Sequence, residues 1–235
     1  MISSLVVTSE DRSEHAEEVV GALLAKAARA SHRELPARRL APPLIRPLTK
    51  AAMWRAKGKS AAAAQVIVLA RYLANEIEKD DTVVAFHFDA DCAWPNVPDA
   101  RADSESLRTR VAQQLDADEG QLAARLVPIV AHWCIESWTY QHTIEAAAIC
   151  REAGDEVAAT HFEAIDTNRA ALDVTERPAE DARYRRVGKK HNHRLATHAS
   201  FPASKVLALE ASFAAALRTL LDVLETPNAP PSEAR

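Results

Sequence analysis

The sequence is poor in glycine, cysteine and aromatic residues. It has five glycines and 5% aromatic residues beside many alanines, and this balance favours helix, because alanine loses least on entering a helix and glycine loses most. The three cysteines, Cys92, Cys134 and Cys150, are odd in number and show no CxxC spacing. They therefore argue against a disulfide framework and against a cysteine zinc knuckle, and they favour a reducing compartment.

Long apolar runs and an excess of charge of one sign are also lacking. No stretch approaches the roughly 20 apolar residues that span a bilayer, and no basic leader precedes the first apolar run. The formal net charge of −4 does not by itself indicate a nucleic-acid or membrane partner. We therefore expect a cytoplasmic protein that is not integral to a membrane and that meets any anionic partner through a local patch.

The composition predicts one globular domain. The chain has 235 residues, of which 48% are hydrophobic and 26% charged, enough for one substantial core and too few for two ordinary domains with linkers. We expect an α/β core over residues 1–145, with a surface loop or insertion at 33–60 that is rich in proline and arginine. A helical extension of the same domain follows at 146–226, and a disordered tail at 227–235.

Hydrophobic periodicity predicts strands alternating with helices. Strands are expected at 5–9, 82–88 and 126–131, and helices at 13–30, 60–79, 104–116, from about Glu136 onward, and as one long helix at 203–225. The run 82–88 is apolar at nearly every position, which is typical of a central strand covered on both faces. This order indicates an α/β fold with a small, mostly parallel sheet flanked by helices, in which ligands bind beyond the carboxyl ends of the strands.

Acidic residues follow two of the expected strands. Glu10 and Asp11 follow the first, and Asp89 and Asp91 follow the second, so parallel neighbouring strands would bring their carboxylates together. In an extended Asp-x-Asp, both side chains point to the same side. Clustered carboxylates repel one another unless a hard cation compensates them, which predicts a site for Mg²⁺ or Mn²⁺ made by Glu10, Asp89 and Asp91. The alternative is that these residues only cap helices or form Asx turns.

Residues 5–14, LVVTSEDRSE, are an expected hydrophobic strand followed by acidic residues, and residues 88–91, FDAD, are a strand end followed by Asp-x-Asp. These segments resemble the Toprim fold, the metal-binding domain of topoisomerases, primases and nucleases of bacterial defence and repair. Its first motif is a hydrophobic strand followed by Glu-Gly-x-(Ser/Thr)-(Asp/Glu), and its second is a strand ending in Asp-x-Asp. The similarity is closer to an uncharacterised Toprim-related bacterial family associated with defence loci, in which a later strand leads into a motif like IESW at 135–138.

The resemblance implies roles for four residues. Glu10 would be the general acid or base, Asp89 and Asp91 would be metal ligands, and Glu136 would be a further acidic member of the catalytic set. The implied activity is that of a metal-dependent nuclease or phosphoryl-transfer protein, serving in an anti-phage defence system with a partner ATPase. This chain departs from the family at Asp11, which replaces the glycine of the first motif and adds negative charge where a phosphate would approach.

A basic segment at 183–194 suggests a grip on nucleic acid. Its cations are Arg183, Arg185, Arg186, Lys189, Lys190 and Arg194. A loop with this charge could hold a nucleic-acid backbone near the acidic site. The alternative is a solvated surface turn, since charged runs usually face water.

A second functional class also remains open. Asp11 and the apolar stripe of the long helix at 203–225 are compatible with a non-catalytic regulatory or binding subunit that assembles through its helical half, including as a homo-oligomer. We expect His87 to be a hydrogen-bonded core histidine, and Trp133 and Trp138 to be core or interface anchors. The sequence has no HExxH zinc helix, Walker loop, dinucleotide fingerprint or nucleophile elbow.

Overall fold

The computed structural model describes residues 2–11, 15–41, 60–79, 81–89, 98–115 and 124–225. Within them, a four-stranded parallel sheet has the strand order β2-β1-β3-β4. The strands are β1 (Ser4–Ser9), β2 (Ala37–Leu40), β3 (Thr82–Asp89) and β4 (Leu126–Ala131). The expected α/β fold with a small parallel sheet flanked by helices is confirmed at this level.

Strand β2 was not predicted as a strand. The segment lay inside the expected loop or extended insertion, and its four residues, ARRL, are all exposed, so no apolar alternation marks it. It pairs in parallel with the outer side of β1, with Leu5 opposite Arg38. A Cβ added to Gly21 in the neighbouring helix would lie 2.9 Å from Cδ of Arg38, so the glycine gives the arginine room. Residues 42–59 of the insertion lie outside the described part.

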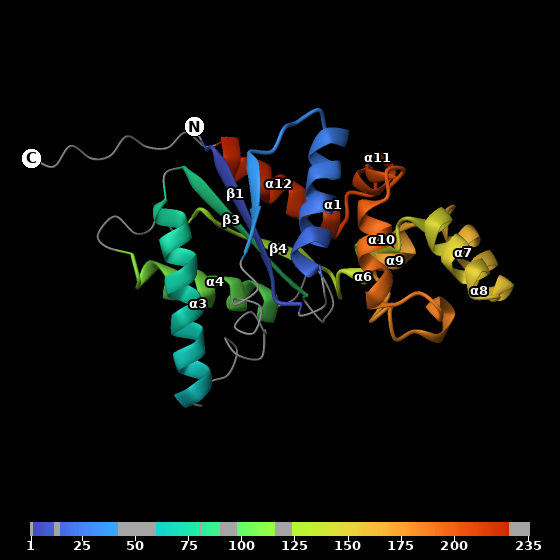
Figure 1. Ribbon diagram of the computed structural model, residues 1–235, viewed down its shortest axis with the longest axis horizontal. Helices are drawn as coiled ribbons and strands as arrows, with labels where there is room; N and C mark the ends of the chain where they lie inside the picture. Colours follow the sequence, from blue (N-terminus) through green and yellow to red (C-terminus); the bar gives the residue numbers. More distant parts are fainter. Residues whose placement is uncertain are drawn as a thin grey trace, which may run out of the picture.

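Helices cover both faces of the sheet. Helices α1 (Ala16–Ala30) and α12 (Ser212–Glu225) share one apolar cluster with the residues at alternate positions of β1, β3 and β4. Helices α3 (Ser60–Glu78) and α4 (Pro98–Ala112) share the other cluster, with the intervening residues of the same strands. Figure 1 shows the strands between α3 and α1. Burial on both faces explains why β3 is apolar almost throughout. Helix α4 begins at Pro98, earlier than the predicted start at 104.

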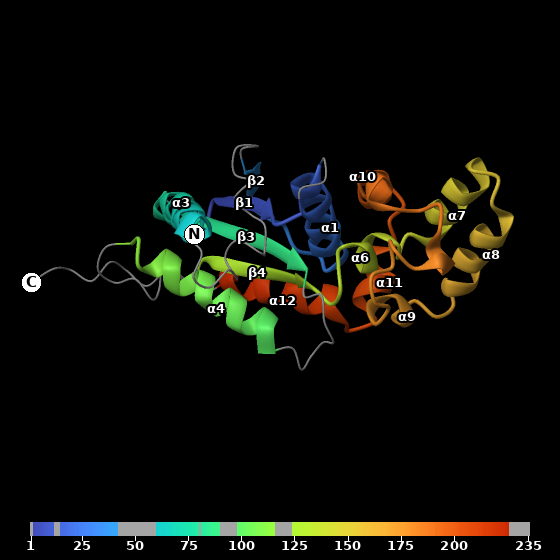
Figure 2. The ribbon, with the colours of Figure 1, turned by 90° about the horizontal axis from the view of Figure 1, so that it is seen from below.

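The chain beyond β4 is helical, as the sequence indicates. It contains α6 (Glu136–Thr139), α7 (Thr143–Glu152), α8 (Glu156–Ile165), α9 (Ala170–Asp173), the 3₁₀ helices η2 (Ala182–Tyr184) and η3 (Lys189–His191), α10 (Asn192–Thr197) and α11 (Ala203–Leu207). A third apolar cluster, which includes Tyr140, Phe162 and Tyr184, holds α7, α8 and η2 together. In Figures 1 and 2, α7 and α8 lie at the end of the molecule toward which the strands point.

The prediction of one long helix at 203–225 is wrong. The structure has two helices, α11 and α12, separated by a turn in which Glu210 has φ 53°. Tertiary contacts fix the start of α12. The carboxylate of Asp173 accepts hydrogen bonds from the backbone amide and the hydroxyl of Ser212, and Nε1 of Trp138 donates to Oγ of Ser212 at 2.7 Å. Among the described residues, no helix has the length and apolar character needed to cross a membrane.

Candidate functional site

The parallel register brings two acidic segments to the same edge of the sheet. Ser9, the last residue of β1, lies beside His87 of β3, and the backbone amide of Glu10 donates to the carbonyl of His87 at 2.9 Å. Asp89 ends β3 two residues later, opposite Ala131 of β4. Figure 1 shows the carboxyl ends of these strands directed toward α6 and α10. We call the group Glu10, Asp11, Asp89, Glu136 and Lys189 the acidic edge.

Glu10 and Asp89 lie together, as the sequence predicts. Oε1 of Glu10, which is 9% exposed, accepts a hydrogen bond of 2.6 Å from the backbone amide of Asp89. Oδ1 of Asp89 in turn accepts from the backbone amide of Ile135 at 2.8 Å, at the start of α6. One oxygen of each carboxylate therefore accepts from a backbone amide, and for Asp89 this amide lies at the start of a helix, as the capping alternative predicts. Asp91 lies outside the described residues.

Glu136 lies behind this pair, fully buried at the first position of α6. Its Oε1 accepts a hydrogen bond of 2.8 Å from Nδ2 of Asn192, the first residue of α10. Burial, and then the nearby carboxylate of Asp89, raise the pKa of Glu136. Burial likewise raises the pKa of the neighbouring Cys134 thiol, so this thiol stays protonated and unreactive near neutral pH.

Lys189, which belongs to the basic segment, compensates part of the negative charge of the carboxylates at the acidic edge. Nζ of Lys189 lies 3.7 Å from Oδ2 of Asp11. Burial alone would lower the pKa of Lys189, but the carboxylates of Asp11, Glu136 and Asp89 outweigh it and the pKa is raised. The sequence assigned Lys189 to a nucleic-acid grip, whereas the fold places it among the acidic residues.

Two buried polar residues, Ser9 and His87, form hydrogen bonds next to the acidic edge. Oγ of Ser9 accepts from the backbone amide of Asp11 at 3.1 Å and lies 2.9 Å from Nδ1 of His87. If the hydroxyl donates to Nδ1, the ring proton sits on Nε2, which faces Oδ1 of Asp89 at 3.4 Å. Ser9 and His87 are both fully buried, so a substrate cannot reach the hydroxyl. His87 is a hydrogen-bonded core histidine, as expected.

The donor chemistry of the acidic edge fits a hard cation. Glu10 and Asp89 offer carboxylate oxygens, the ligand type that Mg²⁺ prefers, and Oδ2 of Asp89 makes no hydrogen bond to a described residue. Mg²⁺ commonly binds through one or two carboxylates and keeps several waters. The described residues do not, however, bring three such oxygens into a single ligand group. Among them, the group with three mutually close ligand atoms is His15, Glu18 and His193.

Most cations of the basic segment already have partners within the chain. Arg183 pairs with Asp181, Arg185 and Arg186 both contact Oδ2 of Asp155, and Arg194 contacts Glu145 and Glu152. Lys190 makes no ion pair with a described residue, and it lines an open hollow with Arg186 and His191. Nucleic-acid binding by this segment stays a prediction, and Lys189 and Lys190 are its strongest candidates.

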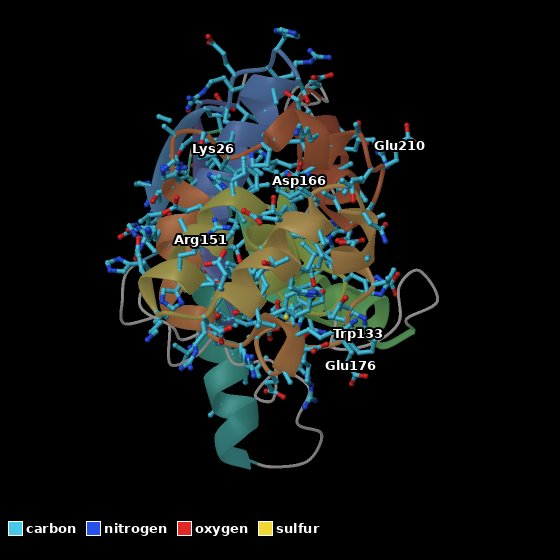
Figure 3. All side chains as sticks on the ribbon, turned by 90° about the vertical axis from the view of Figure 1, so that its right-hand side faces the viewer. Lys26, Trp133, Arg151, Asp166, Glu176 and Glu210 are labelled. Atoms are coloured by element: carbon cyan, nitrogen blue, oxygen red, sulfur yellow. The ribbon has the colours of Figure 1, made fainter. Side chains whose placement is uncertain are left out.

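The two tryptophans after β4 differ in burial. Trp138 is 1% exposed and packs against His87 and Phe213, so it is a core anchor. Trp133 is half-buried and donates through Nε1 to the carbonyl of Val174 at 3.2 Å. Figure 3 shows Trp133 on the same side of the molecule as Glu176. Trp133 thus ties the segment after β4 to the chain beyond α9.

Comparison with known proteins gives no matching family model, no matching curated protein and no matching solved structure. The Toprim resemblance therefore rests on the three motifs alone. Sequence reasoning missed Asn192 and the position of Lys189 at the acidic edge. A single asparagine or lysine far along the chain carries no motif, and only the packing of α10, with the adjoining η3, against α1 and α6 brings them there.

Proposed function

We propose that this protein is a Toprim-like, Mg²⁺-dependent enzyme that cleaves or transfers phosphodiesters of nucleic acid at the acidic edge. The observation that carries the proposal is the contact between the two acidic motifs, in which the Glu10 carboxylate lies 2.6 Å from the Asp89 amide. Lys189 adds a positive charge at the same place, 3.7 Å from Asp11. Carboxylates beside a lysine, at the carboxyl edge of a parallel sheet, suit the binding of a cation and a phosphate.

The proposal gives different parts to the carboxylates, to Lys189 and to Glu136. Glu10, Asp89 and Asp91 would hold Mg²⁺ or Mn²⁺, and the bound ion supplies orientation and charge compensation of the phosphate oxygens. The half-exposed ammonium of Lys189 binds a phosphate oxygen, with Lys190 next to it in the chain. Glu136 is fully buried, so it positions Asn192 and the start of α10 and does not touch the substrate.

The biological setting belongs to the same proposal. The resemblance implies a role in bacterial anti-phage defence and a partner ATPase. The proposal covers DNA and RNA alike, because lysines that bind phosphates contact the backbone and not the bases.

The test is a cleavage assay on the purified protein with Mg²⁺ or Mn²⁺ and with supercoiled, linear and single-stranded DNA and single-stranded RNA. We expect cleavage of at least one substrate, and we expect Asp89→Asn to reduce its rate by about 100-fold or more, since a lost cation contact removes several kcal/mol of transition-state stabilisation. The matched control is Glu180→Gln, which removes an exposed carboxylate paired with Arg177 and should cleave like the parent protein.

A second function, that of a non-catalytic regulatory or binding subunit, is favoured by one observation. The carboxylates of Glu10 and Asp89 hold the amides of Asp89 and Ile135, so they could serve the fold alone. In that case no substrate is cleaved, calorimetry detects no Mg²⁺ binding, and Asp89→Asn only lowers the melting temperature. These results together would overturn the enzymatic proposal.

A further inference from the structure

A second cluster of ligand-type side chains lies between α1 and α10. His15 directly precedes α1, Glu18 lies in its first turn, and His193 lies in α10. Nδ1 of His15 is 3.1 Å from Oε2 of Glu18, and Nε2 of His193 is 3.0 Å from the same oxygen. We propose that these three residues form a binding site for a divalent transition metal of the zinc class.

The donor set selects the class of metal. Two imidazole nitrogens and one carboxylate oxygen suit borderline-soft ions such as Zn²⁺, whereas Mg²⁺ and Ca²⁺ prefer oxygen ligands throughout. Two neutral imidazoles and one carboxylate carry a single negative charge, which a divalent cation compensates. This site therefore differs in chemistry from the acidic edge.

The distances are close to those of a bound ion. With metal–ligand bonds of about 2.0–2.1 Å in tetrahedral geometry, neighbouring ligand atoms lie about 3.3 Å apart. The two contacts to Glu18 measure 3.1 and 3.0 Å, and all three ligand atoms lie within 4.8 Å of one another. The three ligand atoms therefore lie close enough together to share one ion.

The backbone at His15 points to a role beyond helix capping. His15 has φ 66° and ψ 17°, a left-handed conformation, and its side chain does not cap α1. The residues that usually precede a helix are serine, threonine, aspartate and asparagine, whose side chains accept a hydrogen bond from a free backbone amide of the first turn. The imidazole instead lies beside Glu18 and the ring of His193, whose centroid is 4.6 Å away.

The cluster is open to solvent. The side chains of His15 and His193 are each 42% exposed, and that of Glu18 is 39% exposed. An ion can therefore enter, and with three protein ligands it keeps a position for water or another small ligand. Closed structural zinc sites usually have four protein ligands.

The position of the cluster links it to the packing of α10. His193 directly follows Asn192, which donates a hydrogen bond to Glu136. On the other helix, Ala16 directly follows His15. Ala16 and Asn192 line one small pocket together with Ser9 and His87. A metal ion bound here would join α1 to α10 beside the acidic edge. Binding of this ion does not depend on the proposed phosphodiester chemistry.

The experiment measures the binding of Zn²⁺ alone to the chain of 235 residues, which carries no histidine tag and has been treated with a chelator. We expect one Zn²⁺ per chain by calorimetry, and a melting temperature that rises with Zn²⁺, because an ion that binds the folded state stabilises it. His15→Ala and His193→Ala should each weaken binding by at least about tenfold. An excess of Mg²⁺ should not compete.

His32→Ala is the matched control. His32 lies just beyond the other end of α1, is exposed and also has a positive φ, of 57°, so it has the same residue type and backbone conformation without the cluster. It should bind Zn²⁺ like the parent protein. Circular dichroism of the variants checks folding, and Glu18→Gln gives a third, more conservative variant. Unchanged affinity in all three cluster variants, or no binding at micromolar Zn²⁺, would overturn the proposal.

Discussion

Glu136 places a buried, ionisable carboxyl group at the acidic edge. It is fully buried, and burial together with Asp89 raises its pKa. A folded-state pKa above the unfolded value means that the folded form is favoured below the unfolded pKa and loses stability as the pH rises above it. At neutral pH this carboxyl therefore opposes folding, and the hydrogen bond from Asn192 only partly offsets the cost.

Replacing Glu136 tests this at the residue scale. Glu136→Gln keeps the shape and an oxygen acceptor for Asn192 but cannot ionise, so we expect a higher free energy of unfolding at pH 8, with little change at pH 4. Urea unfolding at the two pH values measures it, and Glu180→Gln on the surface is the control. Equal stability of variant and parent at pH 8 would mean that Glu136 carries no electrostatic cost.

The sequence identified single acidic residues better than their neighbours. Glu10 and Asp89 follow apolar strands, and parallel pairing makes their approach predictable. Lys189 and Asn192 reach the same edge from a distant segment. Their arrival depends on how α10 packs against α1, which no local pattern records.

Helix α7 begins at an unusual cap. Nδ1 of His142 accepts a hydrogen bond from the backbone amide of Glu145 at 3.2 Å, and Nε2 lies 3.1 Å from Nδ1 of His198. This cap needs an unprotonated Nδ1. Burial, and then the nearby imidazole of His198, lower the pKa of His142 to about 4, so the folded protein favours the neutral ring.

Titration of His142, the cap of α7, makes the stability of the folded protein depend on pH. Because the folded-state pKa lies below that of the unfolded chain, the cap stabilises the fold fully above about pH 6.5. This contribution falls between pH 6.5 and pH 4, by at most about 3 kcal/mol. His142→Asn keeps an acceptor for the Glu145 amide and does not titrate. We expect unfolding free energies measured from pH 7 to pH 4.5 to fall less in His142→Asn than in the parent, and parallel pH profiles would contradict this.

Other elements show where local patterns fail. Strand β2 has no apolar alternation because it lies at the sheet edge with four exposed residues, so its pairing with β1 decides its conformation. The helical periodicity at 203–225 continues through the turn at Glu210, and only the contacts of Ser212 with Asp173 and Trp138 set the start of α12.

At the scale of the whole molecule, α12 belongs to the core. Phe213, Leu217 and Leu220 share one apolar cluster with α1 and the sheet. The sequence left open that this stripe serves assembly with another chain. Its innermost residues instead cover one face of the sheet, so they are not available to a partner.

Substitutions at two neighbouring leucines of α12 distinguish a role in the core from a role in assembly with another chain. Leu220 is fully buried and Leu221 is partly buried. We expect Leu220→Ala to lower the free energy of unfolding by about 2–5 kcal/mol, through lost burial and a cavity, and Leu221→Ala to lower it by less. Denaturant unfolding with light scattering measures stability and oligomeric state together. A change of oligomeric state in Leu220→Ala without loss of stability would contradict the core assignment.

The amino-acid sequence by itself determined the alternation of strands and helices, the parallel sheet and the approach of Glu10 to Asp89. These follow from hydrophobic periodicity and from the common direction of parallel strands, which are local properties of the chain. Only the tertiary structure decided the edge strand β2, the division of the last helix, the lysine at the acidic edge and the cluster of His15, Glu18 and His193. Each of these depends on contacts between segments far apart in sequence, whose energies no local pattern contains.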